Sequence, residues 1–418
     1  MSGTTAEARI LGFVEALGVV LRQAAEVHVG GIDRVALLAS AGRVLAEDVA
    51  ADRDQPPFDR ATRDGFAVRA EEWTAGNRLA VVGQVRAGEA WAGGALASGQ
   101  AIEIMTGAAV PAGADAVAMI EHVEQSRTEM WAAAGRQLRV GENIVRRGSE
   151  ARQGDVLVGR GTAMGAAEIA VAAACGCAEI AVRKRPVVAI VATGDELVEV
   201  DQTPEEQQIR NSNGYALAAL VAAAGGQPRR LEIAQDTLAD VRARIAEGRK
   251  SDLLLLSGGV SAGKYDLVEE VLAKLRAEFF FAGVKMQPGK PVVFGRLPGR
   301  DSTQEREWTY FFGLPGNPVS TQVTFHCFVE PLLRAMCGAG VGGPRFVQAT
   351  LAEDVVGKAG LTRLLPAFLR HDLVQPEVRL VSWQGSGDLA SNARANCYAV
   401  LPDGHDLRTG DVITVLLR

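Results

Sequence analysis

The clearest pattern of hydrophobic and polar positions lies in the segment 251–320. After Ser251 and an aspartate, four leucines form an apolar run that is too short for a helix. Such a run predicts a strand that is buried on both faces, as the strands of a parallel sheet are. A helix is expected next, because apolar residues recur at helical spacing on one face: Leu267, Val268, Val271, Leu272 and Leu275. The order of strand, turn and helix indicates an α/β domain.

Turns rich in glycine and proline adjoin the strands of this segment. Residues 257–263 read Ser-Gly-Gly-Val-Ser-Ala-Gly, and 313–318 read Gly-Leu-Pro-Gly-Asn-Pro after the strand expected at Trp308–Phe312. Between them, 287–291 read Gln-Pro-Gly-Lys-Pro before the strand expected at Val292–Phe294. Small residues let the backbone approach a ligand closely, and a helix N-terminus favours an anion. One such turn alone only reverses the chain, whereas several at the carboxyl edge of one sheet predict a binding site.

Acidic residues follow the strands of the same predicted sheet. Glu196 lies just after the first strand of the domain, which begins near Arg185. Asp236 follows the strand expected at 230–233, and Asp266 follows the first glycine turn. Asp236 alone is well explained as a helix N-cap. Three carboxylates at one sheet edge nevertheless resemble a Mg²⁺ site, because this cation prefers oxygen ligands.

The segment 55–68 is unusually charged for a connector. Asp59 and Asp64 lie on either side of Arg60 and Arg63, and the apolar sequence Gly-Phe-Ala-Val follows. A surface turn whose charges pair locally would explain this composition. So many charges immediately before an apolar strand favour a further role for the segment.

The remaining pattern indicates several domains, and 418 residues are enough for two to four. Helices expected over Thr5–Glu26 and Leu37–Leu45 are interpreted as packing elements, and a further helix is expected over Pro318–Met336, directly after the turn 313–318. Short strands with glycine turns over 78–123 predict a small β-rich unit. Residues 140–182 then return to the style of the N-terminal region, so the β-rich unit is expected to be an insertion.

We therefore expect a multidomain protein of the α/β and β class. Residues 1–54 together with 140–182 are expected to form an elongated helical and β domain, and 55–139 the inserted β-rich domain. A central three-layer α/β domain with a mostly parallel sheet is expected over 183–337. The strand-rich remainder, 338–418, predicts a C-terminal β-barrel.

Composition narrows the class of ligand and the compartment. The formal net charge is −6 and no basic run stands out, so the chain is a poor candidate for binding nucleic acid. An anionic ligand must then be held by local N–H groups and a few placed cations. The five scattered cysteines indicate neither a disulfide framework nor a structural zinc site. The N-terminus lacks a secretory signal and the apolar segment 163–182 contains two glutamates, so we expect a cytoplasmic protein without a membrane span.

Taken as an ordered set, these motifs resemble the molybdopterin molybdenumtransferase family over nearly the whole length of the chain. The matching segments are 56–68, 105–117, 192–197, 257–266, 288–291 and 313–320. The resemblance implies an elongated domain, an inserted β domain, a central α/β domain and a C-terminal β-barrel. It also implies a homodimer, with the site formed between the central domain of one subunit and other domains of its partner.

The resemblance further implies a reaction in which adenylylated molybdopterin and molybdate give the molybdenum cofactor and AMP, assisted by Mg²⁺. Contacts with the adenylyltransferase that supplies the substrate and with molybdoenzyme chaperones are expected, whereas nucleic acid and membrane are not. The implied catalytic residues are Asp59, Asp64, Asp266 and Lys290, and the implied Mg²⁺ ligands are Glu196, Asp236 and Asp266. The implied substrate-binding residues are Thr106, Thr193, Gly194, Ser257, Gly258, Gly259, Ser261, Gly263, Pro288, Gly289, Pro315, Gly316, Asn317, Arg363 or Arg370, and Ser386.

The chain departs from the family pattern at three places, and two other functions remain as alternatives. Residues 60–63 read Arg-Ala-Thr-Arg where Asn-Ser-Ala-Met is common, Phe66 replaces a common Tyr, and Gln287 stands where Lys is frequent. A molybdopterin adenylyltransferase is one alternative, but its glycine turn usually reads Gly-Gly-Thr-Gly and this chain has Gly-Gly-Val-Ser at 258–261. A non-catalytic scaffold, as in the relative gephyrin, is the other alternative, but the chain lacks the long linker and extra domain of that protein.

Overall fold

The run of leucines forms the centre of a six-stranded sheet in the computed structural model, which describes residues 10–259, 267–299, 308–371 and 375–418. The strand order is β16 (Gln227–Arg230), β13 (Val187–Ala192), β17 (Leu253–Ser257), β21 (Trp308–Leu314), β20 (Val293–Pro298) and β18 (Glu278–Ala282). The first four strands are parallel, and β20 and β18 are antiparallel to their neighbours. The expected mostly parallel sheet is confirmed.

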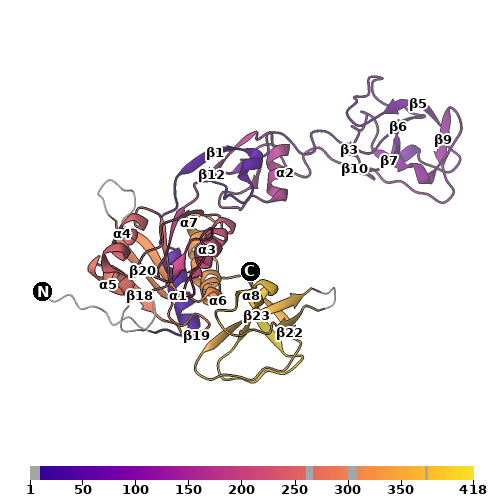
Figure 1. Ribbon diagram of the computed structural model, residues 1–418. Helices are drawn as coiled ribbons and strands as arrows, with labels where there is room; N and C mark the ends of the chain where they lie inside the picture. Colours follow the sequence, from indigo (N-terminus) through magenta and orange to yellow (C-terminus); the bar gives the residue numbers. More distant parts are fainter. Residues whose placement is uncertain (1–9, 260–266, 300–307, 372–374) are drawn as a thin grey trace.

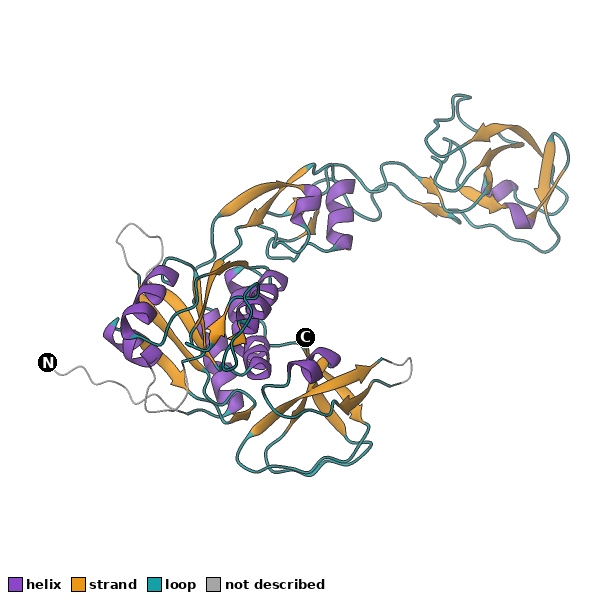
Figure 2. Cartoon of the chain, in the orientation of Figure 1, coloured by secondary structure: helices purple, strands orange, loops and turns teal. Residues whose placement is uncertain are grey.

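Helices cover both faces of this sheet because its strands are apolar on both sides. Leu253 and Leu255 face a core that includes α1 (Phe13–Ala24), α3 (Ser212–Ala223) and the helical run 318–336. The leucines that alternate with them face α4 (Leu238–Gly248) and α5 (Leu267–Lys274), which lie together on the opposite face (Figures 1 and 2). Burying one leucine completely stabilises the fold by about 1.5–3 kcal/mol, so β17 alone is a major source of stability.

The three helices expected from periodicity have different outcomes. The run 318–336 is helical throughout, as α6 (Pro318–Thr324), a π-helical segment (Phe325–Val329) and α7 (Glu330–Met336). Of Thr5–Glu26, residues 13–24 form α1, which packs against α7 and the central sheet. The helix expected over 37–45 is wrong in extent, because only Leu37–Ser40 form a short 3₁₀ turn before the chain becomes extended.

The segment between α1 and β13 leaves the central sheet and returns to it as a narrow arm. Its outgoing and returning strands pair antiparallel: β1 (Ile32–Ala36) with β12 (Glu179–Arg183), β2 (Val49–Ala50) with β11 (Val156–Val158), and β3 (Arg60–Ala61) with β10 (Ile144–Val145). Helix α2 (Ala166–Ala174) packs beside the middle of the arm. Figure 1 shows the arm extending away from the central sheet. The domain limits given above remain predictions.

The tip of the arm is a second six-stranded sheet. Its strand order is β7 (Ala116–Met119), β4 (Gly65–Val68), β6 (Gln100–Ile104), β5 (Leu79–Val85), β9 (Glu129–Ala132) and β8 (Val123–Gln125). Apolar side chains from both faces of this sheet form two small cores of their own. The arm tip therefore packs around its own core and lies far from the central sheet in Figure 1.

The C-terminal region closes into a five-stranded barrel, as expected. Its strands are β22 (Phe346–Leu351), β23 (Thr362–Arg370), β24 (Glu377–Leu380), β25 (Cys397–Leu401) and β26 (Val412–Leu417), and closure is made by the pairing of β23 with β25. Helix α8 (Leu389–Arg394) lies at one side of the barrel. A short strand, β19 (Met286–Gln287), pairs with β23 and so connects the barrel to the central sheet.

Candidate functional site

The candidate site is a crevice at the carboxyl edge of the central sheet. The chain places β16 on one side of β13 and β17 on the other, so β13 and β17 flank the topological switch point of the sheet. Open α/β sheets bind ligands at this point. A cavity of about 1110 Å³ lies here, and ten residues predicted from the sequence line it: Thr193, Gly194, Glu196, Asp236, Ser257, Gly258, Gly259, Pro315, Gly316 and Asn317.

The glycine turn after β17 is shaped by its contact with the turn after β13. Gly258 has a φ of +92°, and a Cβ atom there would lie 2.6 Å from the carbonyl oxygen of Thr193. A Cβ atom on Gly259 would lie 2.8 Å from Thr193 Oγ1. Both positions therefore require glycine, since a side chain would push the two turns apart. The Gly258 N–H donates to Leu314 O. This N–H group is therefore not available to an anion, contrary to the expectation from the sequence.

Asn213 connects three elements of the crevice wall. Its Nδ2 donates to Ser257 Oγ over 3.0 Å and to Gly316 O over 2.7 Å, so α3 is joined to the turns after β17 and β21. Asn213 is not the cap of α3, which is Asn211, whose side chain accepts from the Gly214 N–H. A residue two positions into a helix gives no sequence signal for such a bridge.

Two buried polar atoms of the crevice have no hydrogen-bond partner among the residues that the structure describes. They are Thr193 Oγ1 and Asn213 Oδ1. A buried polar atom left unpaired costs about 1–3 kcal/mol, so such atoms are rarely left without a function. One atom is a hydroxyl and the other a carbonyl oxygen. They are thus suited to a ligand that carries both hydrogen-bond donors and acceptors.

Two of the three predicted carboxylates line the crevice. Asp236 is not the N-cap of α4, because Thr237 Oγ1 accepts the hydrogen bond from the Asp240 N–H. The carboxylate of Glu196 lies back over Gly194, where an added Cβ would lie 2.4 Å from Glu196 Oε2. Both side chains are exposed, and neither carboxylate accepts a hydrogen bond from the part of the chain that is placed.

The remaining predicted residues of the glycine turn cannot be located. Ser261, Gly263 and Asp266 lie outside the described residues. Within the described ranges, no group of three or more histidine, cysteine, aspartate or glutamate side chains is arranged to hold a metal ion. The Mg²⁺ ligand set therefore stays a prediction.

The C-terminal region contributes the rim of the crevice. Asn317 Nδ2 donates to Ser386 Oγ over 2.8 Å, and the Val319 N–H donates to the Ser386 carbonyl oxygen over 3.0 Å. Gly387 and Leu389 also line the cavity. These contacts bring the predicted Ser386 to the first turn of α6.

The Pro-Gly-Lys-Pro turn lies beside the crevice. Pro291 lines the cavity, whereas Lys290 is exposed next to it and its ammonium has no partner among the placed residues. Pro288 and Gly289 are the buried residues of this turn, and a Cβ on Gly289 would lie 2.6 Å from Thr324 Cγ2. These two residues thus position the lysine and do not themselves line the cavity.

A cation replaces the lysine that the family commonly has at position 287. Lys358 Nζ lies 3.3 Å from Gln287 Oε1, and it comes from the barrel. Arg363 pairs with Gln287 across β19 and β23, and burial lowers the pKa of its guanidinium. Arg370 stands at the far end of β23, about 23 Å away at the usual rise per residue, so it cannot share this location with Arg363.

The predicted residues of the charged loop lie on the arm. Asp64 Oδ1 accepts from the Thr106 N–H over 2.6 Å and from Thr106 Oγ1 over 2.7 Å, and these bonds hold its pKa below the usual range. Asp59 accepts from Arg146 Nη1 over 2.6 Å and from the Arg147 N–H over 2.9 Å. Burial raises the pKa of Asp59, but these two bonds outweigh it and the pKa is lowered overall.

The loop and the crevice do not meet within one chain. The loop lies beside β3 and β10, at the end of the arm that is remote from the central sheet (Figure 1). Arg60 pairs with Glu150 at 2.9 Å, so one of the two unusual arginines is held by a local ion pair. The guanidinium of Arg63 is exposed, and its one hydrogen bond within the described residues is donated to the neighbouring Thr62 carbonyl.

The central sheet and its crevice define an α/β ligand-binding protein with accessory β domains. Family models match it in three consecutive parts: "MoeA N-terminal region (domain I and II)" over 11–176, "Probable molybdopterin binding domain" over 189–335 and "MoeA C-terminal region (domain IV)" over 348–417. A molybdopterin molybdenumtransferase of Staphylococcus aureus (strain COL) is 34% identical over 92% of this chain and 90% of its own length. The chain belongs to the molybdopterin molybdenumtransferase family.

Further relatives agree over the same extent. A molybdopterin molybdenumtransferase of Staphylococcus epidermidis is 32% identical over 96% of this chain and 94% of its own length. Two solved structures of the molybdopterin biosynthesis MoeA protein of Pyrococcus horikoshii superpose with TM-scores of 0.81 and 0.74, at 27% and 31% identity. Each match covers 98% of this chain, and at least 99% of the other. Among the helices that are placed, none has the length and apolar character that a membrane crossing requires.

Proposed function

We propose that this chain is an enzyme that inserts molybdenum from molybdate into adenylylated molybdopterin and releases AMP. The observation that carries the proposal is the crevice, where Thr193 Oγ1 and Asn213 Oδ1 have no hydrogen-bond partner within the described ranges and lie between two glycine turns. A pterin and an adenosine both carry donors and acceptors that can pair with such atoms. Curated relatives that match this chain over 90% or more of their own length are named molybdopterin molybdenumtransferase, which supports the proposal.

The phosphates of the substrate would lie at the turns after β17 and β21. Gly259 and Gly316 are exposed there without side chains, so an anion can come close to the backbone. The start of α6 also faces the crevice through Asn317 and Pro318, and its helix dipole favours negative charge. Binding at these points would fix the bond that is broken on release of AMP.

The family implies Mg²⁺, and the residues of the crevice fit this cation. Glu196 and Asp236 offer carboxylate oxygens that accept no hydrogen bond from the described residues, and oxygen is the ligand type that Mg²⁺ prefers. We propose that these two residues hold it together with Asp266. When bound, Mg²⁺ would neutralise charge on the phosphates and on the departing AMP.

Cations beside the crevice would attract and orient molybdate. Lys290 is presented on a turn fixed by two prolines, and its ammonium is free to meet an oxyanion. Lys358 and Arg363 lie on the same side, around Gln287. Because the whole chain has a formal charge of −6, such local cations are needed to bring molybdate close.

The working unit that we propose is a homodimer with composite sites. Asp59, Asp64 and Thr106 lie on the arm, away from the crevice of the same chain. An elongated arm can reach the crevice of a second copy related by a two-fold axis. Exposed apolar side chains on α1 and just before it, with Val14 79% and Ile10 53% exposed, offer a surface for such an association.

The proposed function is tested by whether the product activates a molybdenum enzyme. Purified protein is incubated with adenylylated molybdopterin, molybdate and Mg²⁺, and the mixture is added to a molybdoenzyme prepared without cofactor. We expect recovery of that enzyme's activity, and none when molybdate is omitted. Recovery without this protein, or no recovery with it, would contradict the proposal.

A further inference from the structure

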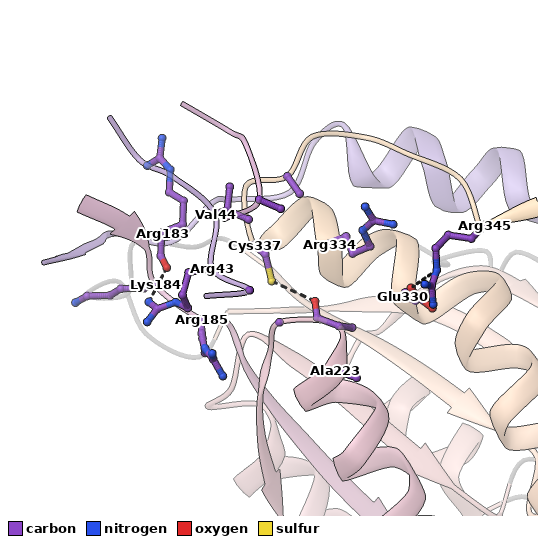
Figure 3. A pocket seen from close by; sticks show the side chains of 15 residues that line it. Arg43, Val44, Arg183, Lys184, Arg185, Ala223, Glu330, Arg334, Cys337 and Arg345 are labelled. Carbon is purple, nitrogen blue, oxygen red and sulfur yellow. Dashed lines mark hydrogen bonds and ion pairs between the residues drawn. The ribbon is translucent and has the colours of Figure 1, made fainter. Parts of the chain in front are cut away.

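A second cavity lies where the arm joins the central sheet. Its volume is about 260 Å³, and it shares no lining residue with the crevice. Its walls come from the base of the arm, from the end of α3 and from α7 (Figure 3). We call it the junction pocket, and it is defined by its six cationic side chains: Arg43, Arg183, Lys184, Arg185, Arg334 and Arg345. No residue predicted from the sequence to be functional lies in it.

The charge of the junction pocket is strongly positive in a chain that is negative overall. Against six cations, Glu330 is the only carboxylate among the residues that line it. Glu330 is already engaged, because its Oε2 lies 2.8 Å from His326 Nδ1 and its Oε1 lies 3.7 Å from Arg345. Like charges held together repel one another, so an arrangement of this kind favours an anionic occupant.

Most of these cationic side chains form no hydrogen bond or ion pair with the described residues of the chain. Arg43 Nη2 donates to Asp33 and to the Arg183 carbonyl oxygen, both over 2.8 Å, yet its buried Nε stays without a partner. Arg345 is paired with Glu330, and the side chains of the remaining four have no hydrogen-bond or ion-pair partner in the ranges that the structure describes: Arg183, Lys184, Arg185 and Arg334. Their donors are therefore available to a ligand.

Three of the cations lie around Cys337 on the cavity wall. Figure 3 shows Arg43 and Arg185 on one side of Cys337 and Arg334 on the other. Burial raises the pKa of the Cys337 thiol to about 11, and the positive charges of Arg185, Arg43 and Arg334 oppose this rise. Three chain segments that are far apart in sequence thus direct positive charge toward the same sulfur atom.

We propose that the junction pocket binds a small polyanion of the phosphate class. Guanidinium groups match phosphate oxygens with paired hydrogen bonds, and the volume is that of a small ion with a few waters, not of a nucleotide-sized ligand. Arg43 and Arg183 belong to the arm, whereas Arg334 belongs to the central helices. The bound anion therefore also cross-links the arm to the central sheet.

Calorimetric titration of the full-length protein with inorganic pyrophosphate tests the binding. The double variant Arg185→Gln and Arg334→Gln removes the charge of two exposed side chains but keeps a polar group at both positions. We expect pyrophosphate to bind this pocket roughly tenfold more weakly or worse in the double variant, since charge-assisted hydrogen bonds are lost. Arg242→Gln, an exposed arginine on α4, is the matched control and should leave binding unchanged.

A third variant distinguishes pyrophosphate binding at the junction pocket from pyrophosphate binding at the crevice. The crevice is also proposed to accept phosphates. Binding of pyrophosphate at the junction pocket should therefore persist in Asn213→Ala and be weakened in the double variant. If the double variant binds pyrophosphate as wild type does, or Arg242→Gln weakens it equally, the proposal is wrong. Malonate, a dianion without phosphate geometry, should bind more weakly, and equal binding would overturn the assignment to the phosphate class.

Hydrogen exchange tests the cross-link. The connections 25–31 and 184–186 run between the arm and the central sheet, and Gly30 and Gly31 pack against Lys184. We expect pyrophosphate to slow amide exchange in these connections for wild type and for Lys290→Ala, but not for the double variant. Exchange that is unchanged in wild type at saturating pyrophosphate would contradict a cross-linking role.

Discussion

The side-chain amide of Asn213 donates to the Gly316 carbonyl oxygen over 2.7 Å, and through this bond α3 fixes the turn that follows β21. The same amide donates to Ser257 Oγ over 3.0 Å. One side chain thus sets the distance between the two glycine turns that form the crevice. Its carbonyl oxygen is buried and has no hydrogen-bond partner in the part of the chain that the structure describes.

Replacing Asn213 with Ala should therefore impair catalysis more than folding. Loss of the two hydrogen bonds should cost about 1–3 kcal/mol of stability. Loss of positioning in the crevice should slow AMP release by about 100-fold, as for other preorganised groups. Asn396→Ala, which also removes two side-chain hydrogen bonds but at a residue that does not line the crevice, is the control and should release AMP at the wild-type rate. A normal rate in Asn213→Ala would remove this residue from the site.

The second prediction concerns Gly258 and compares it with a glycine of the same conformation. Gly258 has a φ of +92°, and a Cβ atom added there would lie 2.6 Å from the Thr193 carbonyl oxygen. Gly360 has a φ of +90°, but a Cβ atom added there would meet open space. Gly360→Ala should cost about 1–2 kcal/mol for the backbone conformation alone. Gly258→Ala should cost more than that and should abolish AMP release. Equal losses of stability, measured by denaturant unfolding, would show that the close approach of the two turns is unimportant.

The third prediction separates two interpretations of Lys290. If the ammonium meets a substrate oxyanion, Lys290→Ala should cost roughly 2–4 kcal/mol of transition-state stabilisation. If it is only a solvated lysine, the substitution should change stability by less than about 0.5 kcal/mol and leave the rate intact. We expect a large loss of rate at an unchanged unfolding midpoint, because the ammonium has no partner in the described part of the protein. Lys285→Ala, an exposed lysine on the same connection, serves as the control.

The glycine and proline turns could be predicted from sequence because their physical requirement is local. Gly258 has a positive φ, which glycine adopts without steric cost, and Pro318 is suited to the first turn of α6. The leucine run of β17 was equally clear, since both of its faces are buried. For this reason the central sheet, and the edge at which its site lies, followed from the sequence.

Features that depend on tertiary contacts did not follow from the sequence. Strand β23 was not predicted, because its residues do not alternate and Pro366 lies at its middle, although it closes the barrel. The Asn213 bridge joins residues 44 and 103 positions apart, and nothing near Asn213 signals either contact. The junction pocket collects cations from position 43 to position 345, which only the folded chain brings together.

The fourth prediction tests whether sites are shared between two copies. An Asp64→Asn variant and an Asn213→Ala variant should each be nearly inactive as pure preparations. In hybrid dimers one site carries both defects and the other carries neither, if the arm serves the partner's crevice. Co-expression in equal amounts should then restore about a quarter of the wild-type activity, on statistical assembly of dimers. Two Asn213→Ala chains with different tags give the control, and activity that stays at the control level would argue against composite sites.

The most direct measurement is the release of AMP from adenylylated molybdopterin as a function of molybdate. With Mg²⁺ present, the proposed function predicts that AMP appears in step with molybdenum incorporated into the pterin. Omitting molybdate or chelating Mg²⁺ should reduce the release to background. AMP released equally with and without molybdate, or no AMP released under any of these conditions, would contradict molybdenum insertion at the crevice.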